Sequence, residues 1–153
     1  MPTRVAVALG SNLGDRQAHL DYAVTRLSAL LAGMRVSSYI ETTPVDVPGD
    51  QPPFLNAAVV GETPLPSRAL LEALLAIESE RGRARPFPGA ARSLDVDLVL
   101  FGHDQIDEPG LVVPHPRFRE RRFVLEPLAE IAPDLVDPRT GKTVGQLLTR
   151  LEG

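Results

Sequence analysis

The stretch RSLDVDLVLFG, residues 92–102, decides how the rest of the chain is arranged. Its apolar residues first alternate with polar ones and then run together, which is typical of a strand with both faces largely buried. Asp95 and Asp97 are two residues apart, so both carboxylates are expected on one face, which Val99 and Phe101 should continue. The other face is expected to carry four apolar side chains: Leu94, Val96, Leu98 and Leu100.

Outward from this strand, the preceding residues predict elements in a regular order. The expected elements are a strand at 4–9, a helix from 16 to about 31, a strand at 34–42, a strand at 54–62 and a helix at 68–80. Asp15 and Ser67 are the expected helix N-caps, and Gly33 is expected to end the first helix. With a strand at 94–101 the order is β-α-β-β-α-β, the ferredoxin-like core of an α+β fold.

The helix at 68–80 is expected to turn its apolar residues toward the sheet: Leu70, Leu71, Leu74, Leu75 and Ile77. Residues 43–53 are rich in proline and glycine, and residues 82–91 are basic, so both are expected to be loops. Beyond residue 101, the sequence predicts a C-terminal extension of a turn, a short strand and helices. At 153 residues the whole chain, 1–153, fits a single domain.

Composition excludes several classes of protein. A net charge of −4 argues against a broad nucleic-acid surface, and no apolar run approaches the roughly 20 residues of a membrane span. The absence of cysteine excludes disulfides, thiolate metal sites and cysteine nucleophiles. The apolar stretch at 5–9 is too short for a signal peptide, so a cytoplasmic location is expected.

The paired aspartates point to a metal. Two adjacent carboxylates at the edge of an apolar surface repel each other unless a cation joins them, and oxygen ligands favour Mg²⁺ or Mn²⁺. Such an ion usually completes its shell with phosphates, which arginines also bind, and eight of the 15 arginines lie between residues 81 and 122. The simpler alternative is a pair of solvated acids that form salt bridges with Arg92.

Three further residues suit a flat partner. Phe54 opens a strand and Phe123 follows an arginine cluster, so either ring could stack on a heterocycle, although core packing would explain each equally simply. Asn56 lies on the same strand face as Phe54 and offers both donors and acceptors to a ring edge. His115 lies between two prolines. It could be an ordinary surface histidine or an imidazole that contacts phosphate.

Seven segments of the sequence form a recognisable set: GSNLGDR (10–16), ETTPV (41–45), FLNAAV (54–59), IESERGRAR (77–85), RSLDVDLVLFG (92–102), VPHPR (113–117) and RRFVLEPLAEIAP (121–133). Together they resemble the 6-hydroxymethyl-7,8-dihydropterin pyrophosphokinase family of folate biosynthesis. They occur in order over nearly the whole chain, and R-[ST]-L-D-[LV]-D is the most specific.

The resemblance implies transfer of a pyrophosphoryl group from MgATP to the hydroxymethyl group of the pterin, with release of AMP. Asp95 and Asp97 would hold two Mg²⁺ ions. The triphosphate would be neutralised or positioned by Arg83, Arg92, His115 and Arg121, with Arg85 arriving from a loop. The pterin would lie between Phe54 and Phe123, and its edge would be read by Asn56 and the backbone of Thr43, Pro44 and Val45.

The resemblance is incomplete in one loop, because FPGAARSLDVD lacks the tryptophan and one arginine of the R-W-G-P-R sequence that members commonly carry. The contacts that close this loop over substrate are therefore expected to differ. Two other classes remain open: a non-catalytic ferredoxin-like binding module and a metal-dependent phosphohydrolase. The expected partners are ATP and a dihydropterin, with the protein acting as a monomer.

Overall fold

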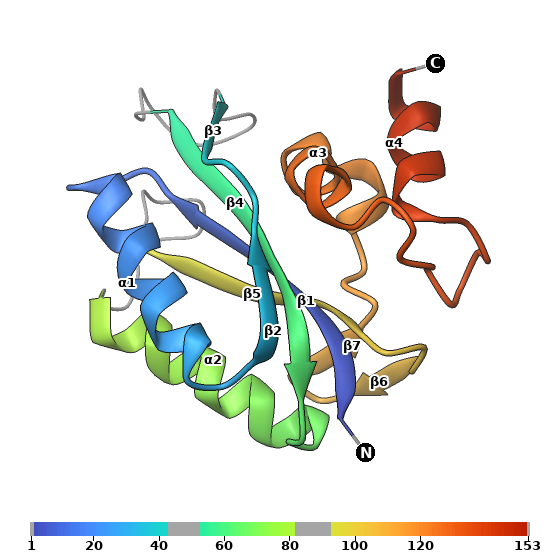
Figure 1. Ribbon diagram of the computed structural model, residues 1–153, viewed down its shortest axis with the longest axis horizontal. Helices are drawn as coiled ribbons and strands as arrows, with labels where there is room; N and C mark the ends of the chain where they lie inside the picture. Colours follow the sequence, from blue (N-terminus) through green and yellow to red (C-terminus); the bar gives the residue numbers. More distant parts are fainter. Residues whose placement is uncertain (1, 43–52, 82–92, 153) are drawn as a thin grey trace.

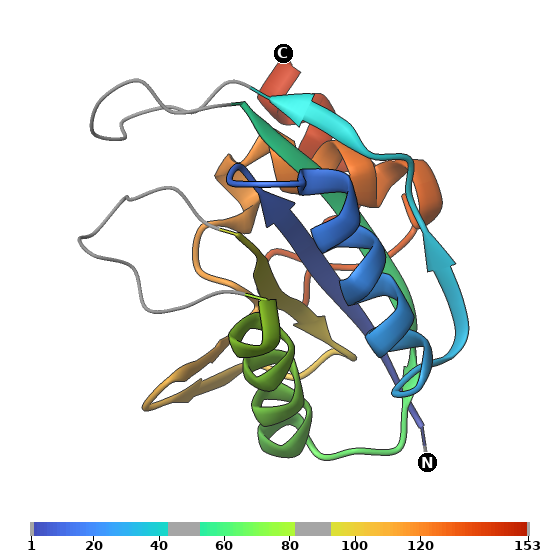
Figure 2. The same ribbon diagram turned by 90° about the vertical axis from the view of Figure 1, so that its left-hand side faces the viewer.

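The computed structural model describes residues 2–42, 53–81 and 93–152. One antiparallel sheet separates two layers of helices, with α1 and α2 on one face and α3 and α4 on the other (Figure 1). The turned view in Figure 2 shows α1 lying along the sheet, with α2 beside its lower end. The expected mixture of helices and an antiparallel sheet is confirmed. Within the described part of the chain, every helix is too short or too polar to cross a lipid bilayer.

The central strand of the sheet is β1 (Thr3–Ser11), which is buried from Val5 onward. It pairs antiparallel with β4 (Phe54–Thr63) on one side and with β5 (Asp95–Phe101) on the other. The strand expected at 34–42 is two strands, β2 (Ala32–Val36) and β3 (Ile40–Thr42), both paired with β4. The order across the sheet is β2-β4-β1-β5.

Helix α1 (Arg16–Ser28) begins as the sequence predicts and ends earlier. The Asp15 side chain accepts a hydrogen bond from the backbone N–H of Ala18 at 3.1 Å, which confirms the N-cap. The C-cap is Ala29, and Gly33 lies inside β2 with a φ of 59°, so its predicted role in ending the helix is wrong. The positive φ belongs to the backbone of β2, and glycine adopts it without steric cost.

Helix α2 (Ser67–Arg81) presents a narrower apolar face than expected. Leu70, Leu74 and Ile77 are fully buried against the sheet in the core shared with α1, the α1–α2 core. Leu75 is 49% exposed, so its predicted inward position is wrong. It follows Leu74 by about 100° of helical turn, and that rotation carries it off the buried stripe.

Strand β5 contains a bulge that reverses the alternation of its side chains. Leu98 pairs with Val7 of β1 and Leu100 pairs with Ala6, so Val99 is an extra residue between them. Leu100 consequently packs in the core under α3 and α4, the α3–α4 core, whereas Phe101 packs in the α1–α2 core. The predicted faces of Leu100 and Phe101 are therefore wrong.

The C-terminal extension begins with a hairpin in place of the single expected strand. Its elements are β6 (Ile106–Glu108), β7 (Leu111–Val113), the 3₁₀ turn η1 (Phe118–Glu120), α3 (Arg122–Ile131) and α4 (Val144–Glu152). The chain passes from β7 into η1 through a cis peptide bond between Val113 and Pro114. Phe118 is fully buried and fixes η1 against the α3–α4 core.

Adjacent leucines of α2 allow a direct test of this packing. Leu74→Ala is expected to lower the free energy of unfolding by about 2–5 kcal/mol, because it removes a fully buried side chain and leaves a cavity. Leu75→Ala, the matched control, is expected to change it by less than about 0.5 kcal/mol. Urea denaturation of both variants measures the difference. Equal losses would contradict the assigned helix face.

Candidate active site

The paired aspartates lie in a row of residues that crosses three strands. In β5, Asp95 is opposite Gly10 of β1, and Asp97 is opposite Ala8. In β4, Asn56 is opposite the same Gly10. Residues directly opposite each other in a sheet share a face. The register therefore places both carboxylates and the Asn56 amide on one face, as expected for Asp95 and Asp97.

Gly10 lies between Asn56 and Asp95 in this row and carries no side chain. A β-carbon built there would lie 3.4 Å from Oδ1 of Asn56 and 3.6 Å from Cδ1 of Phe54. The Phe54 ring and the Asn56 carbonyl therefore border the space above Gly10, while Asp95 borders it from β5. Because glycine has no side chain, the Asn56 carbonyl and the Phe54 ring approach the β1 backbone closely at this point.

The Asn56 side chain is only 3% exposed and is held in one orientation. Its Nδ2 donates to Oγ1 of Thr42 at 2.7 Å and to the backbone carbonyl of Ile40 at 3.4 Å. Because the amino group bonds to β3, the carbonyl oxygen is turned toward Gly10. The amide is therefore fixed with its acceptor oxygen beside Gly10.

Asp95 is 8% exposed and Asp97 is half-buried. Between them, the backbone N–H of Val96 donates to Oε2 of Glu78 at 2.7 Å, which ties the end of α2 to the start of β5. This partner of Glu78 is a main-chain group of a strand, and side-chain spacing in the sequence carries no signal for such a contact.

The donor set on this face fits a hard cation. Two carboxylates on one strand face supply oxygen ligands, which Mg²⁺ prefers. Among the described residues, no cluster of three or more histidine, cysteine, aspartate or glutamate side chains could hold a metal by itself. A Mg²⁺ ion at Asp95 and Asp97 would thus take its remaining ligands from water or substrate, as this ion usually does.

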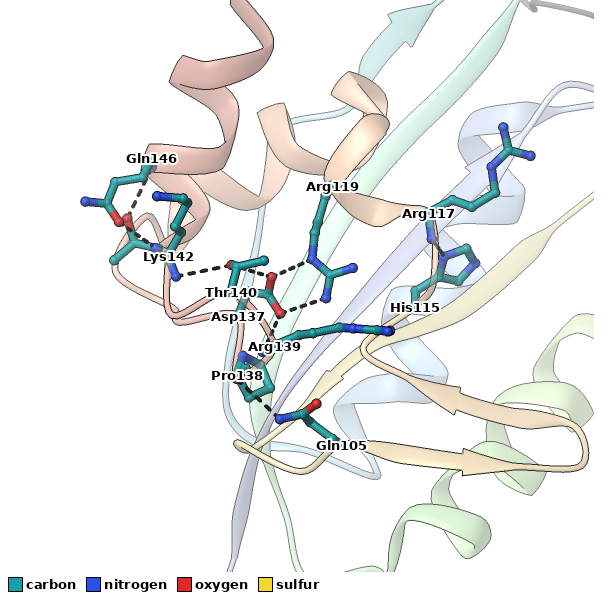
Figure 3. Close-up of polar contacts among 11 residues, drawn as sticks. Gln105, His115, Arg117, Arg119, Asp137, Pro138, Arg139, Thr140, Lys142 and Gln146 are labelled. Atoms are coloured by element: carbon teal, nitrogen blue, oxygen red, sulfur yellow. Dashed lines mark hydrogen bonds and ion pairs between the residues drawn. The ribbon is translucent and has the colours of Figure 1, made fainter.

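His115 is attached to the same strand at the bulge residue Val99. Its backbone N–H donates to the carbonyl of Val99 at 3.0 Å, two residues beyond Asp97. Its Nδ1 accepts from the backbone N–H of Arg117 at 3.2 Å (Figure 3). The neutral ring therefore carries its proton on Nε2. Burial lowers the pKa of His115, and the charges of Arg121 and Arg117 lower it further.

The downstream arginines have different roles. Arg119 is paired with Asp137, and Arg122 is paired with Glu126 and Glu152. Arg121 lies at the start of α3, where its guanidinium is 5.5 Å from the centre of the Phe123 ring. Phe123 is 40% exposed, so it presents an aromatic face at the protein surface instead of packing in the core.

The remaining predicted site residues lie outside the described part of the chain: Thr43, Pro44, Val45, Arg83, Arg85 and Arg92. The described residues fall into two groups. The first group surrounds Gly10 and consists of Asp95, Asp97, Phe54 and Asn56. The second group lies on the segment that follows β7 and consists of His115, Arg121 and Phe123.

The characteristic sequence pattern of 7,8-dihydro-6-hydroxymethylpterin-pyrophosphokinase (HPPK) matches residues 6–133, which include every element of this site. The chain belongs to the HPPK family. Similar proteins named 2-amino-4-hydroxy-6-hydroxymethyldihydropteridine pyrophosphokinase occur in Synechocystis, with 42% identity over 95% of this chain and 75% of that protein, and in Methylorubrum extorquens, with 45% identity over 98% and 94%. The relative from Bacillus subtilis is 44% identical over 92% of this chain and 84% of its own length.

Solved structures agree with the HPPK fold. The HPPK-DHPS of Plasmodium falciparum superimposes with a TM-score of 0.76 at 14% identity, over 98% of this chain. An HPPK-DHPS solved in complex with substrates gives a TM-score of 0.77 at 12% identity. The chain spans only 45% and 43% of those two proteins, so this likeness concerns the fold of the shared part.

The environment of His115 predicts how its imidazole titrates. Its pKa is expected below the ordinary 6.5, so the ring is neutral at pH 7. As pH falls from 6.5 to the native pKa, the unfolded chain binds more protons than the folded one. The free energy of unfolding should therefore decrease over that interval and be independent of this group above it. NMR titration of the ring measures the pKa directly.

Arg121→Gln should raise the pKa of His115, because it removes a nearby positive charge. Arg150→Gln, in the last turn of α4, is the matched control and should leave it unchanged. A native pKa above 6.5 would show that burial and the two arginines do not dominate this site.

Proposed function

We propose that this chain transfers a pyrophosphoryl group from ATP to 6-hydroxymethyl-7,8-dihydropterin, the reaction for which its family is named. In this reaction the hydroxymethyl oxygen forms a bond to the β-phosphorus of ATP, and the bond from that phosphorus to the α,β-bridging oxygen breaks. The hydroxyl proton is released, and the products are the pterin diphosphate and AMP. The observation that carries the proposal is the row Asp95–Gly10–Asn56, which joins a cation site to a ring-edge acceptor.

The carboxylates supply the metal part of the site. We assign two Mg²⁺ ions to Asp95 and Asp97, supported by their shared strand face and their oxygen-only chemistry. Bound Mg²⁺ would neutralise charge on the phosphates that react. The chain itself holds both carboxylates fixed, through the β1–β5 register and the bond from the backbone of Val96 to Glu78. Phosphoryl transfer depends mainly on such positioning and neutralisation.

The phosphate chain is assigned to the segment after β7. Neutral His115 would donate its Nε2–H to a phosphate oxygen, since its Nδ1 already accepts from Arg117. Arg121 would add positive charge at the start of α3, where the helix dipole also favours an anion. Arg83, Arg85 and Arg92 complete the proposed set from the basic loop.

The pterin is assigned to the space above Gly10. Its pyrimidine edge carries an amino group and a ring N–H, and the Asn56 carbonyl is an acceptor fixed toward that space. Phe54 would cover one face of the ring and the exposed Phe123 the other. The backbone of Thr43, Pro44 and Val45, directly after Thr42, would contact the rest of the edge.

The arrangement of the chain is proposed on the same grounds. We assign the sheet with α1 and α2 to a ferredoxin-like core in which β3 continues the edge strand β2 along β4, and residues 1–153 to one domain. The enzyme is proposed to act as a monomer, in the cytoplasm.

Product analysis tests this function. The protein is mixed with MgATP, with and without 6-hydroxymethyl-7,8-dihydropterin, and AMP is resolved from ADP. AMP that forms only with the pterin supports pyrophosphoryl transfer. ADP would indicate a kinase, and nucleotide breakdown that is indifferent to pterin would indicate a phosphohydrolase. Nucleotide binding without turnover would indicate a binding module.

Asp97→Ala tests the cation site, because Asp97 is half-buried and its loss should spare the fold. The expected result is a decrease in kcat on the order of 10²–10³-fold or more, since charge stabilisation in the transition state is removed. Circular dichroism verifies the fold. Asp107→Ala, which removes an exposed carboxylate from β6, should retain full activity. Normal turnover of Asp97→Ala would refute the cation site.

A further inference from the structure

Asp137 is a buried charged residue that the proposed reaction does not use. Its side chain is completely inaccessible to solvent, and it lies between η1 and the turn that leads into α4 (Figure 3). Burying a carboxylate is costly unless it is paired and hydrogen-bonded. The contacts that compensate this cost therefore show what the residue holds in place.

Four hydrogen bonds converge on this carboxylate. Arg119 donates from Nε to Oδ2 at 2.5 Å and from Nη2 to Oδ1 at 2.8 Å, a two-pronged pair. The Thr140 hydroxyl donates to Oδ2 at 2.7 Å, and the backbone N–H of Arg139 donates to Oδ1 at 3.1 Å. Both oxygens are satisfied, so the orientation of the carboxylate is fixed.

The backbone around Asp137 is equally fixed. Its N–H donates to the carbonyl of Lys142 at 2.8 Å, and its own carbonyl accepts from Gly141 at 2.8 Å. A bridge between Val136 and Thr143 closes the same turn. Asp137 is therefore a rigid anchor at the entrance to α4.

The other half of the pair lies within the proposed phosphate-binding segment. Arg119 is in η1, four residues after His115 and two before Arg121. Successive hydrogen bonds run through this turn, from Phe118 N to His115 O at 3.3 Å and from Arg121 N to Phe118 O at 3.2 Å. The Arg119 guanidinium also lies 4.9 Å from the centre of the Phe118 ring. A shift of Arg119 would thus move both His115 and Arg121.

We propose that the Arg119–Asp137 pair is a positioning device that sets the placement of His115 and Arg121 for the phosphates of ATP. This inference rests on the proposed function of those two residues. Stability alone is a weak reason for such a pair, because replacing a buried ion pair with apolar residues of similar size is often neutral or stabilising. A planar two-pronged contact instead imposes one geometry.

The test replaces both charges together, as Arg119→Met with Asp137→Leu, so that no buried charge loses its partner. The expected protein is folded, with kcat/KM for ATP reduced about 10–100-fold, because small displacements of binding groups have effects of this size. The KM for the pterin is expected to change much less than that for ATP, since Phe54 and Asn56 lie on β4 and only Phe123 follows Arg121 in the chain. The matched control, Arg122→Met with Glu126→Leu, removes an exposed pair one turn along and should leave ATP kinetics unchanged.

Arg121→Met separates this inference from the proposed function. If Arg121→Met and the double variant both raise the KM for ATP, the positioning device is supported. If only Arg121→Met does so, the device is refuted and the proposed site stands. If Arg121→Met has no effect, the phosphate-binding role fails, and the inference fails with it. Equal damage to ATP and pterin kinetics in the double variant would indicate a merely structural pair.

If the double variant does not fold, Thr140→Val decides the question. It removes one of the four hydrogen bonds to Asp137 and keeps both charges. A rise in the KM for ATP that clearly exceeds any change in that for the pterin supports the device, and unchanged kinetics in a folded Thr140→Val protein would refute it.

Discussion

The site depends on the antiparallel register of β4, β1 and β5. Opposite residues share a sheet face, so this register alone aligns Asp95, Gly10 and Asn56. A slip of one residue in β5 would turn both aspartates toward the apolar α1–α2 core. That slip is strongly disfavoured because Val96 would lose its buried position at the same time. Packing of the core and placement of the polar row are therefore two results of one constraint.

Charge on the segment from His115 to Arg122 is arranged by pairing. Arg119 and Arg122 carry carboxylate partners, so their charges are largely compensated within the protein. His115 is neutral at pH 7, because burial and two arginines lower its pKa. A bound polyanion would raise the pKa of His115 again, since a nearby negative charge favours the protonated ring. The segment from His115 to Arg121 thus has an electrostatic state that responds to what is bound there.

Local patterns in the sequence predicted much of this arrangement. Asp15 capped a helix and Asp95 and Asp97 shared a face, because both features depend on residues close together in the chain. The bulge at Val99 was not predictable, since it arises from pairing with β1 and leaves no glycine or proline signal in β5. The contacts of Glu78 with Val96 and of Asp137 with Arg119 were not predictable for the same reason. Each joins residues 18 apart in sequence, and the Val96 partner is a backbone group.

The face that carries the site changes character along β1. Ala6 and Ala8 lie in the α3–α4 core with Ala58 of β4, and such small side chains let α3 pack closely on the sheet. At Gly10, two residues further, the same face is bordered by Phe54 and Asn56 instead of by helix. The helical layer must therefore end near this point for a substrate to reach the row. The segment that runs from His115 through η1 into α3 carries Arg121 and Phe123 as well, so these residues of the proposed site are attached to the helical layer. A shift of α3 that improved its packing would displace these residues, so stability and substrate placement are coupled through the same helix.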